Sequence, residues 1–159
     1  MTIICAIDFS ASSETATRLG AALARRRGDK LLLLHVLEPL PVDPVGAGIR
    51  LADWDSAGGP YDLVFSNPPY IPAADIESLA PDVARFEPRA ALNGGPDGLD
   101  AYRALAGLLP GILPSGGYAL LEIGLGQANA MEPLFRNLEF VRIAPDLSGT
   151  PRCVILRKP

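Results

Sequence analysis

The feature that most constrains the fold is an apolar run that ends at two consecutive prolines. Tyr61-Asp62-Leu63-Val64-Phe65 is typical of a buried strand in a parallel sheet. Pro68 and Pro69 cannot continue a hydrogen-bonded ladder, so we expect the strand to end at Asn67. Ligands bind outside the carboxyl ends of the strands in open α/β sheets. The turn that begins at Asn67 is therefore the first candidate site.

The side chains of this turn suit a planar NH2 group. Each proline fixes its own φ angle and restricts the residue before it, so the turn is stiff. The side-chain oxygen of Asn67 and the carbonyl of Pro68 can each accept one N–H, and the Tyr70 ring can stack on a flat π-system. Holding both hydrogens aims the nitrogen at an electrophile, which is catalysis by positioning and electrostatics. The alternative, a structural proline-rich turn after a strand, stays open.

Other apolar runs predict a single α/β domain over residues 1–159. Two runs, 2–7 and 31–37, flank a helical stripe, which indicates a right-handed parallel βαβ unit. We expect the strands that end at Asp8, Glu38, Ala52 and Asn67 to place those ends on one edge of a sheet. A helical stripe from Leu99 to Leu109 predicts a helix that ends at Pro110. The closing runs 140–144 and 152–156 are joined by a short loop, which predicts an antiparallel pair.

Composition excludes several classes of protein. No apolar run approaches a membrane span, so we expect no membrane partner. The net charge of −4 argues against a nonspecific nucleic-acid binder, which would carry a basic face. Cys5 and Cys153 lie in apolar runs and are typical of reduced core residues in a cytoplasmic protein. His35, the only histidine, has no cysteine or histidine neighbours in metal-ligand spacing, so no metal site is predicted and His35 is more typical of a packed residue.

Three stretches near the N-terminus carry a family resemblance: Ala6-Ile7-Asp8-Phe9-Ser10, Ala21-Ala22-Leu23-Ala24 and Leu33-Leu34-His35-Val36-Leu37-Glu38-Pro39. Through them, residues 1–45 resemble the start of a universal stress protein. In that family the acid after the first strand and the end of the second strand help to hold an adenine nucleotide, which implies roles for Asp8 and Glu38. The family's glycine-rich phosphate loop has no counterpart in this sequence.

A second set of stretches runs in order over more than 100 residues: Asp62 to Pro72, Val83 to Leu92, Gly94 to Asp100, Pro114 to Gly117, Leu121 to Gly124 with Gln127, and Asp146 to Gly149 with Arg152. Through them, residues 46–159 resemble the catalytic domain of the HemK-type protein-(glutamine-N(5)) methyltransferases that act on peptide chain release factors. The Asn-Pro-Pro-Tyr motif alone is shared with adenine-amino methyltransferases of DNA. The loop around Phe86 to Arg89 and the strand end at Glu122 to Gly124 favour the glutamine family.

This second resemblance implies a fold, a cofactor and a site. The fold is a Rossmann-like three-layer α/β sandwich of the class I methyltransferase type, with a mostly parallel sheet and an antiparallel C-terminal pair. S-adenosylmethionine lies across the strand ends, and Asn67, Pro68, Pro69 and Tyr70 match the glutamine-binding motif. Trp54 matches an aromatic residue that contacts the adenine, with Asp53 before it. Trp54 as a half-buried core aromatic is the alternative.

Two departures from the methyltransferase pattern bear on activity. In the family, the first strand is followed by a glycine-rich turn that lets the backbone approach the cofactor. The equivalent residues in this sequence, 8–14, contain no glycine. The helical N-terminal domain of the family has no counterpart. In one alignment Glu38 takes the place of the acid that holds the ribose hydroxyls; in another Asp8 does. We favour the first, because it supplies a complete sheet.

The predicted function is methyl transfer from S-adenosylmethionine to a glutamine side chain of a protein, the peptide chain release factor, with cofactor binding impaired by the missing glycine turn. The first alternative is a nucleotide-binding module of the stress-protein kind, in which the Asn-Pro-Pro-Tyr turn has no function. The second is a chimera that folds and catalyses nothing.

Overall fold

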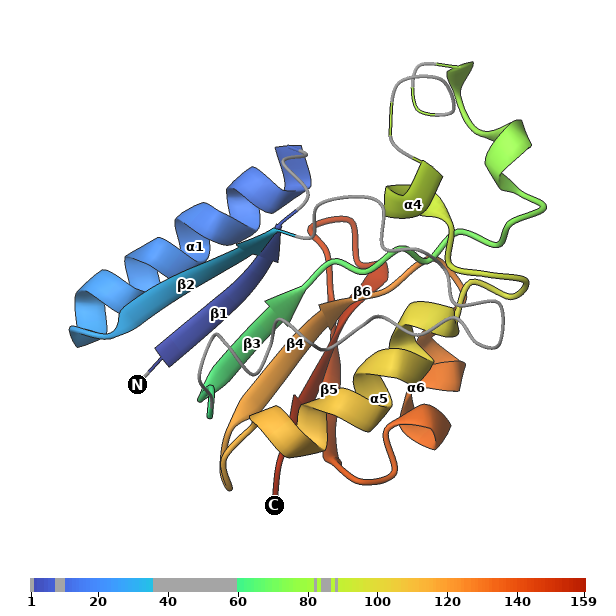
Figure 1. Ribbon diagram of the computed structural model, residues 1–159. Helices are drawn as coiled ribbons and strands as arrows, with labels where there is room; N and C mark the ends of the chain where they lie inside the picture. The colour runs from blue at the N-terminus through green and yellow to red at the C-terminus, as the bar shows by residue number, and fades with distance from the viewer. Residues whose placement is uncertain (1, 8–10, 36–59, 82, 84–86, 88) are drawn as a thin grey trace.

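The computed structural model describes residues 2–7, 11–35, 60–81, 83, 87 and 89–159, and these form a six-stranded mixed sheet with helices on both faces (Figure 1). The strand order is β2-β1-β3-β4-β6-β5. The strands are β1 (Thr2–Ile7), β2 (Lys30–His35), β3 (Leu63–Ser66), β4 (Tyr118–Glu122), β5 (Glu139–Pro145) and β6 (Pro151–Arg157). The principal helices are α1 (Ala11–Arg27), α5 (Asp100–Ile112) and α6 (Ala128–Leu134), with the short α4 (Arg89–Leu92) and a 3-10 turn at Ile76–Ser78.

The four strands β2, β1, β3 and β4 are parallel neighbours. Ile7 pairs with His35, and Cys5 pairs with Phe65, so the carboxyl ends of β1, β2 and β3 lie on one edge. This confirms the shared edge expected for these strands. The residues Asp8, Glu38 and Ala52 themselves, together with the strand expected before Ala52, lie outside the described residues.

The chain changes direction along the sheet between β1 and β3. From β1 the path through α1 steps outward to β2, and from β3 the path through α5 steps the other way to β4. Crossovers of one hand that step in opposite directions place their helices on opposite faces of the sheet. Figure 1 shows α1 on one face and α5 and α6 on the other, which confirms the three-layer α/β arrangement. The point between β1 and β3 is the topological switch point, where open α/β sheets bind ligands.

The C-terminal strands form the expected antiparallel pair. β6 lies between β4 and β5 and is antiparallel to both, with Leu121 opposite Val154 and Ala119 opposite Leu156. These four side chains are fully buried. The core is made by this face of the sheet and by apolar side chains of the adjoining helices, Tyr102, Leu105, Leu109, Met131 and Phe135. The site described below therefore rests on a packed layer that holds the ends of β3 and β4 in place.

The sequence predicts that helix α5 ends at Pro110. The helix instead continues for two more residues and ends at Ile112. The last carbonyls of any helix have no partner within it and need others. Lys158 supplies two such partners near the end of α5: its Nζ donates to the carbonyl of Pro110 over 2.6 Å and to that of Leu113 over 2.8 Å. The backbone N–H of Tyr61 donates to the carbonyl of Ile112 over 2.8 Å. Contacts from distant parts of the chain therefore stabilise the end of the helix beyond the proline.

Among the described residues, no helix has both the length and the apolar character needed to cross a membrane.

Candidate functional site

The Asn67–Tyr70 turn lies where β3 ends, beside the switch point of the sheet. β3 ends at Ser66, paired with β1 on one side and with β4 on the other. Pro68 is buried, while Asn67, Pro69 and Tyr70 are partly buried. The strand thus ends one residue before the predicted end, and the two prolines carry the chain out of the ladder as expected.

The residues after the turn are tied to the segment before α5. The backbone N–H of Ile71 donates to the carbonyl of Leu92 over 3.0 Å, and Gly94 donates back to the carbonyl of Ile71 over 2.9 Å. Ala73 donates to Gly95 over 2.9 Å. The sequence predicts a loop over the site from residues 86 to 95, but residues 89–92 form the short α4. Residues 92–95 form backbone hydrogen bonds with residues 71–73, directly after the Asn67–Tyr70 turn. The turn is held at both ends, by β3 before it and by these hydrogen bonds after it.

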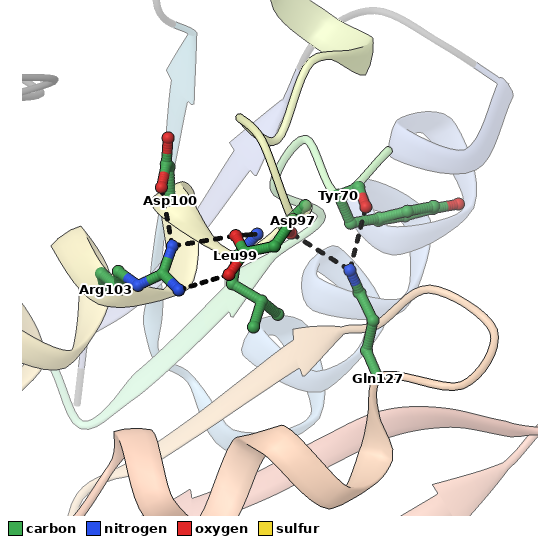
Figure 2. A network of polar contacts seen from close by, with 7 residues as sticks. Tyr70, Asp97, Leu99, Asp100, Arg103 and Gln127 are labelled. Carbon is green, nitrogen blue, oxygen red and sulfur yellow. Dashed lines mark hydrogen bonds and ion pairs between the residues drawn. The ribbon is translucent and has the colours of Figure 1, made fainter. Parts of the chain in front are cut away.

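A third connection comes from Gln127, which lies at the start of α6 in the loop after β4 (Figure 2). Its Nε2 donates to the carbonyl of Tyr70 over 2.9 Å and to the carbonyl of Gly98 over 3.1 Å. Its Oε1 accepts the backbone N–H of Gly124 over 2.9 Å. One amide thus connects three segments: the Asn67–Tyr70 turn, the loop before α5 and the end of β4.

Close packing around Gln127 accounts for two glycines. A Cβ on Gly98 would lie 2.7 Å from Gln127 Nε2 and still closer to the carbonyl oxygen of Tyr70, and Gly98 has a φ of +76°. A Cβ on Gly124 would lie 2.9 Å from both Gln127 Oε1 and the Tyr70 ring. Contacts below 3.0 Å are closer than side chains tolerate, and a positive φ is unfavourable for other residues. Both backbones can approach the turn only because these residues are glycines.

The Tyr70 side chain lies beside Glu122, the last residue of β4. Burial raises the pKa of the Tyr70 phenol, and the charge of Glu122 and a side-chain hydrogen bond with it raise the pKa further, while Arg152 lowers it. The hydroxyl of Tyr102 donates to the backbone carbonyl of Glu122 over 2.8 Å. Both tyrosines thus interact with Glu122 at the end of β4.

An ion cluster holds the outer side of the loop before α5 (Figure 2). Arg103 NH1 donates to Asp97 Oδ1 over 2.9 Å and to Asp100 Oδ1 over 2.7 Å. Asp97 Oδ1 also accepts the backbone N–H of Leu99 over 3.1 Å. The side-chain hydrogen bond with Arg103 lowers the pKa of Asp97 to about 2. This cluster positions the start of α5 and, through Gly98, the partner of Gln127.

The structure thus covers half of the predicted site. Asn67, Pro68, Pro69 and Tyr70 form one turn at the switch point. The four residues expected to bind the cofactor, Asp8, Glu38, Asp53 and Trp54, lie outside the described residues, so their roles remain predictions.

Three residues of the site, Gln127, Gly98 and Tyr102, have no role that the sequence predicts. Gln127 is only part of a stretch that carries a family resemblance. A signal was present, because a glutamine three residues after Gly124 follows a predicted buried strand at the edge where ligands bind. Its partners, the carbonyls of Tyr70 and Gly98, are 57 and 29 residues away in the chain, and no local pattern indicates them.

Comparison with known proteins divides the chain into two parts. Residues 1–55 match the model of the universal stress protein family. This confirms the resemblance stated for residues 1–45 and extends it by ten residues. The additional residues, 46–55, include Asp53 and Trp54, which the predicted boundary at residue 45 assigns to the methyltransferase-like part.

Curated relatives confirm the other resemblance. A protein of Rhodospirillum rubrum named release factor glutamine methyltransferase is 49% identical over 111 residues, which are 68% of this chain and 34% of the relative. Proteins of the same name are 47% identical in Geobacter sulfurreducens, over 59% of this chain and 34% of the relative, and in Cereibacter sphaeroides, over 70% and 41%. The matched part spans roughly a third of the length of these relatives.

Among solved structures, a methyltransferase from Pyrococcus furiosus has a TM-score of 0.48 at 12% identity, over 98% of this chain and 74% of that one. This similarity is low, so the evidence for the fold is the order of the strands in the sheet. The chain therefore combines a stretch similar to universal stress proteins with a stretch similar to release factor glutamine methyltransferases.

Proposed function

We propose that this chain transfers a methyl group from S-adenosylmethionine to the side-chain amide of a glutamine in a protein, and that the protein is a peptide chain release factor. The observation that carries the proposal is the Asn67–Tyr70 turn, which lies at the switch point of the sheet and is held there from three directions. The names of relatives that are 47–49% identical support the choice of substrate and cofactor.

In the proposed reaction the turn acts by positioning. The Asn67 side-chain oxygen and the Pro68 carbonyl each accept one hydrogen of the substrate NH2, and the Tyr70 ring covers the flat amide. When bound, S-adenosylmethionine would supply an electrophilic methyl group to that nitrogen. The nitrogen–carbon bond would form as the carbon–sulfur bond breaks with its electron pair going to sulfur, and the cationic nitrogen would then lose a proton to water. No strong base is needed before attack, so the protein contributes orientation and electrostatics.

The same proposal assigns the cofactor to Asp8, Glu38, Asp53 and Trp54, and treats residues 1–159 as one domain. The pairing of β1 with both β2 and β3 supports the single domain, because the stress-protein-like βαβ unit contributes strands to the same sheet. The shared edge of β1, β2 and β3 supports a cofactor site assembled from both parts of the chain. The expectation of a cytoplasmic protein, made from Cys5 and Cys153, belongs to the proposal as well.

The test is methyl incorporation from radiolabelled S-adenosylmethionine into a release-factor fragment that carries a Gly-Gly-Gln motif. Mass spectrometry should place the added methyl group on the glutamine side chain. The control is the same fragment with glutamate in place of that glutamine, which offers no amide nitrogen. Equal incorporation into both fragments, or none into either, would overturn the proposal.

A second candidate function is a nucleotide-binding module of the stress-protein kind, and the match of residues 1–55 to that family favours it. In that case ATP would bind and S-adenosylmethionine would not. Calorimetric titration with each ligand separates the two functions. A chain that binds neither ligand would be the inactive chimera.

A further inference from the structure

We propose that Gln127 is the positioning residue of the Asn67–Tyr70 turn: its side-chain amide sets the place of the Tyr70 carbonyl and, through it, of the groups that hold the substrate amide. The catalytic consequence rests on the proposed function. The geometric part stands on the contacts of Gln127 alone and can be tested without any reaction.

The contacts determine the orientation of the amide. Both hydrogens of Nε2 are used, by the carbonyls of Tyr70 and Gly98, and Oε1 faces the N–H of Gly124. If the amide were turned around, an oxygen would face two carbonyl oxygens and an NH2 would face an N–H. Only one orientation satisfies the three partners. This place fits a primary amide, whose nitrogen carries two donors and whose oxygen is an acceptor.

The position of these partners explains how Gln127 acts on the turn. Gly124 follows β4, whose face is packed in the core, so Oε1 is anchored to a rigid part of the sheet. Nε2 transmits that position to the Tyr70 carbonyl, which follows the two prolines directly. Displacement of a positioning group by about 1 Å can cost a hundredfold in rate. The close approaches of Gly98 and Gly124 leave no space in which a different side chain could replace the contact.

Two variants remove the contacts in different ways. Gln127→Met keeps an unbranched chain of similar length and loses all three hydrogen bonds. Gln127→Glu keeps the shape but brings a carboxylate against two carbonyl oxygens. When that carboxylate is protonated, it regains one donor, so the Glu variant should recover part of its function as the pH falls and the Met variant should not.

Lys158→Met is the matched control. Lys158, like Gln127, donates from one nitrogen to two backbone carbonyls, those of Pro110 and Leu113. It follows β6, opposite the start of β4, which is the other edge of the sheet from the turn. The two Met variants therefore each remove two side-chain-to-carbonyl bonds, at opposite edges of the molecule. If activity falls because the protein is less stable, it should fall in both variants. If it falls because the turn is no longer positioned, it should fall only in Gln127→Met.

In the methyl-transfer assay we expect kcat to fall roughly 10- to 100-fold for Gln127→Met. The KM for S-adenosylmethionine should change less than about twofold, because this side chain contacts the acceptor side of the site. Lys158→Met should keep the kcat of the unaltered chain. A Gln127→Met enzyme whose kcat stays within twofold would overturn the inference, and so would an equal loss in Lys158→Met.

Amide hydrogen exchange tests the geometry without any reaction. The Ile71 N–H, which donates to Leu92, belongs to the same peptide group as the Tyr70 carbonyl that accepts from Gln127, so its exchange rate reports movement of that peptide group. We expect exchange at Ile71 to become on the order of tenfold faster in Gln127→Met and to stay unchanged in Lys158→Met. Unchanged exchange in both variants would refute the positioning role. If the unaltered chain transfers no methyl group, the proposed function fails, and this measurement still decides the role of Gln127.

Discussion

His35 ends β2 and Asn67 follows β3, at the same edge of the sheet. Two prolines come directly after Asn67 and make its turn stiff. Asn67→Ala removes one of the two acceptors proposed for the substrate NH2 and leaves its nitrogen free to rotate. Loss of such a group costs about two to three orders of magnitude in rate, and we expect that loss in methyl incorporation. His35→Asn should leave any activity largely intact. Equal activity of the two variants would show that the turn is not the catalytic centre.

Gly98 gives a prediction of stability. Gly98→Ala forces a side chain into a positive φ and against Gln127 and Tyr70, so we expect it to lower the free energy of unfolding by more than about 2 kcal/mol. Gly126 has a φ of +83° with open space around it, so Gly126→Ala isolates the backbone term, at about 1–2 kcal/mol.

Gly107 provides a control of opposite sign. It lies exposed within α5, where a Cβ would meet nothing within 4 Å. Gly107→Ala should therefore stabilise the protein by about 0.5–1 kcal/mol. Urea unfolding of the three variants measures all these changes. A loss at Gly98 no larger than that at Gly126 would show that the close packing around Gln127 contributes nothing to stability.

At the residue scale, the sequence predicts those parts of the site whose chemistry is local. The Asn67–Tyr70 turn is recognisable because the strand, the two prolines and the aromatic residue are consecutive. The role of Gln127 is not recognisable in this way, because its partners are backbone atoms that only the folded sheet brings near. Gly98 likewise has a constraint that depends on Tyr70, 28 positions earlier in the chain.

At the element scale, the first turn of α5 depends on the charge of Asp97. The pKa of this carboxyl is lowered to about 2, chiefly by the hydrogen bond with Arg103, from a usual value near 3.8. A group with a lowered native pKa favours the folded state when it is ionised, so its contribution is complete above pH 3.8 and is lost as the pH falls towards 2. The cluster is exposed, so solvent screens this contribution.

The measurement is unfolding by urea between pH 5 and pH 2. We expect Asp97→Asn to show a flatter decline of stability in this window than the unaltered chain. Glu132→Gln, a change of the same kind at an exposed position in α6, is the control and should leave the slope nearly as it was. Identical slopes for the Asp97 variant and the unaltered chain would contradict the assigned cause.

Elements were predicted well where periodicity was strong, and their ends less well. The antiparallel pair β5 and β6 and the parallel βαβ unit follow from apolar runs and loop lengths. The predicted end of α5 was wrong, because the rule that proline stops a helix takes no account of Lys158, 48 residues away, which donates to a carbonyl at the helix end. A local rule fails where a distant side chain provides the missing partner.

At the scale of the whole molecule, two sequence resemblances meet in one sheet. β1 and β2 come from the stretch that matches universal stress proteins, and β3 to β6 from the stretch that resembles methyltransferases. Such a combination is physically reasonable, because a parallel βαβ unit can add to the edge of a parallel sheet whatever its source. The switch point lies between β1 and β3, at the junction of the two parts, so any cofactor site at this point depends on both.

This junction leads to the last prediction, which concerns cofactor affinity. The sequence after β1, residues 8–14, contains no glycine, whereas the methyltransferase pattern has glycines here that let the backbone approach the ligand. Each hydrogen bond lost in this way costs roughly 0.5–1.5 kcal/mol, and about 1.4 kcal/mol is a factor of ten in affinity. The loss of several should weaken binding by about a hundredfold or more. Calorimetry should therefore give a Kd for S-adenosylmethionine well above the micromolar range, and a micromolar or lower Kd would show that this serine-rich segment is an adequate substitute.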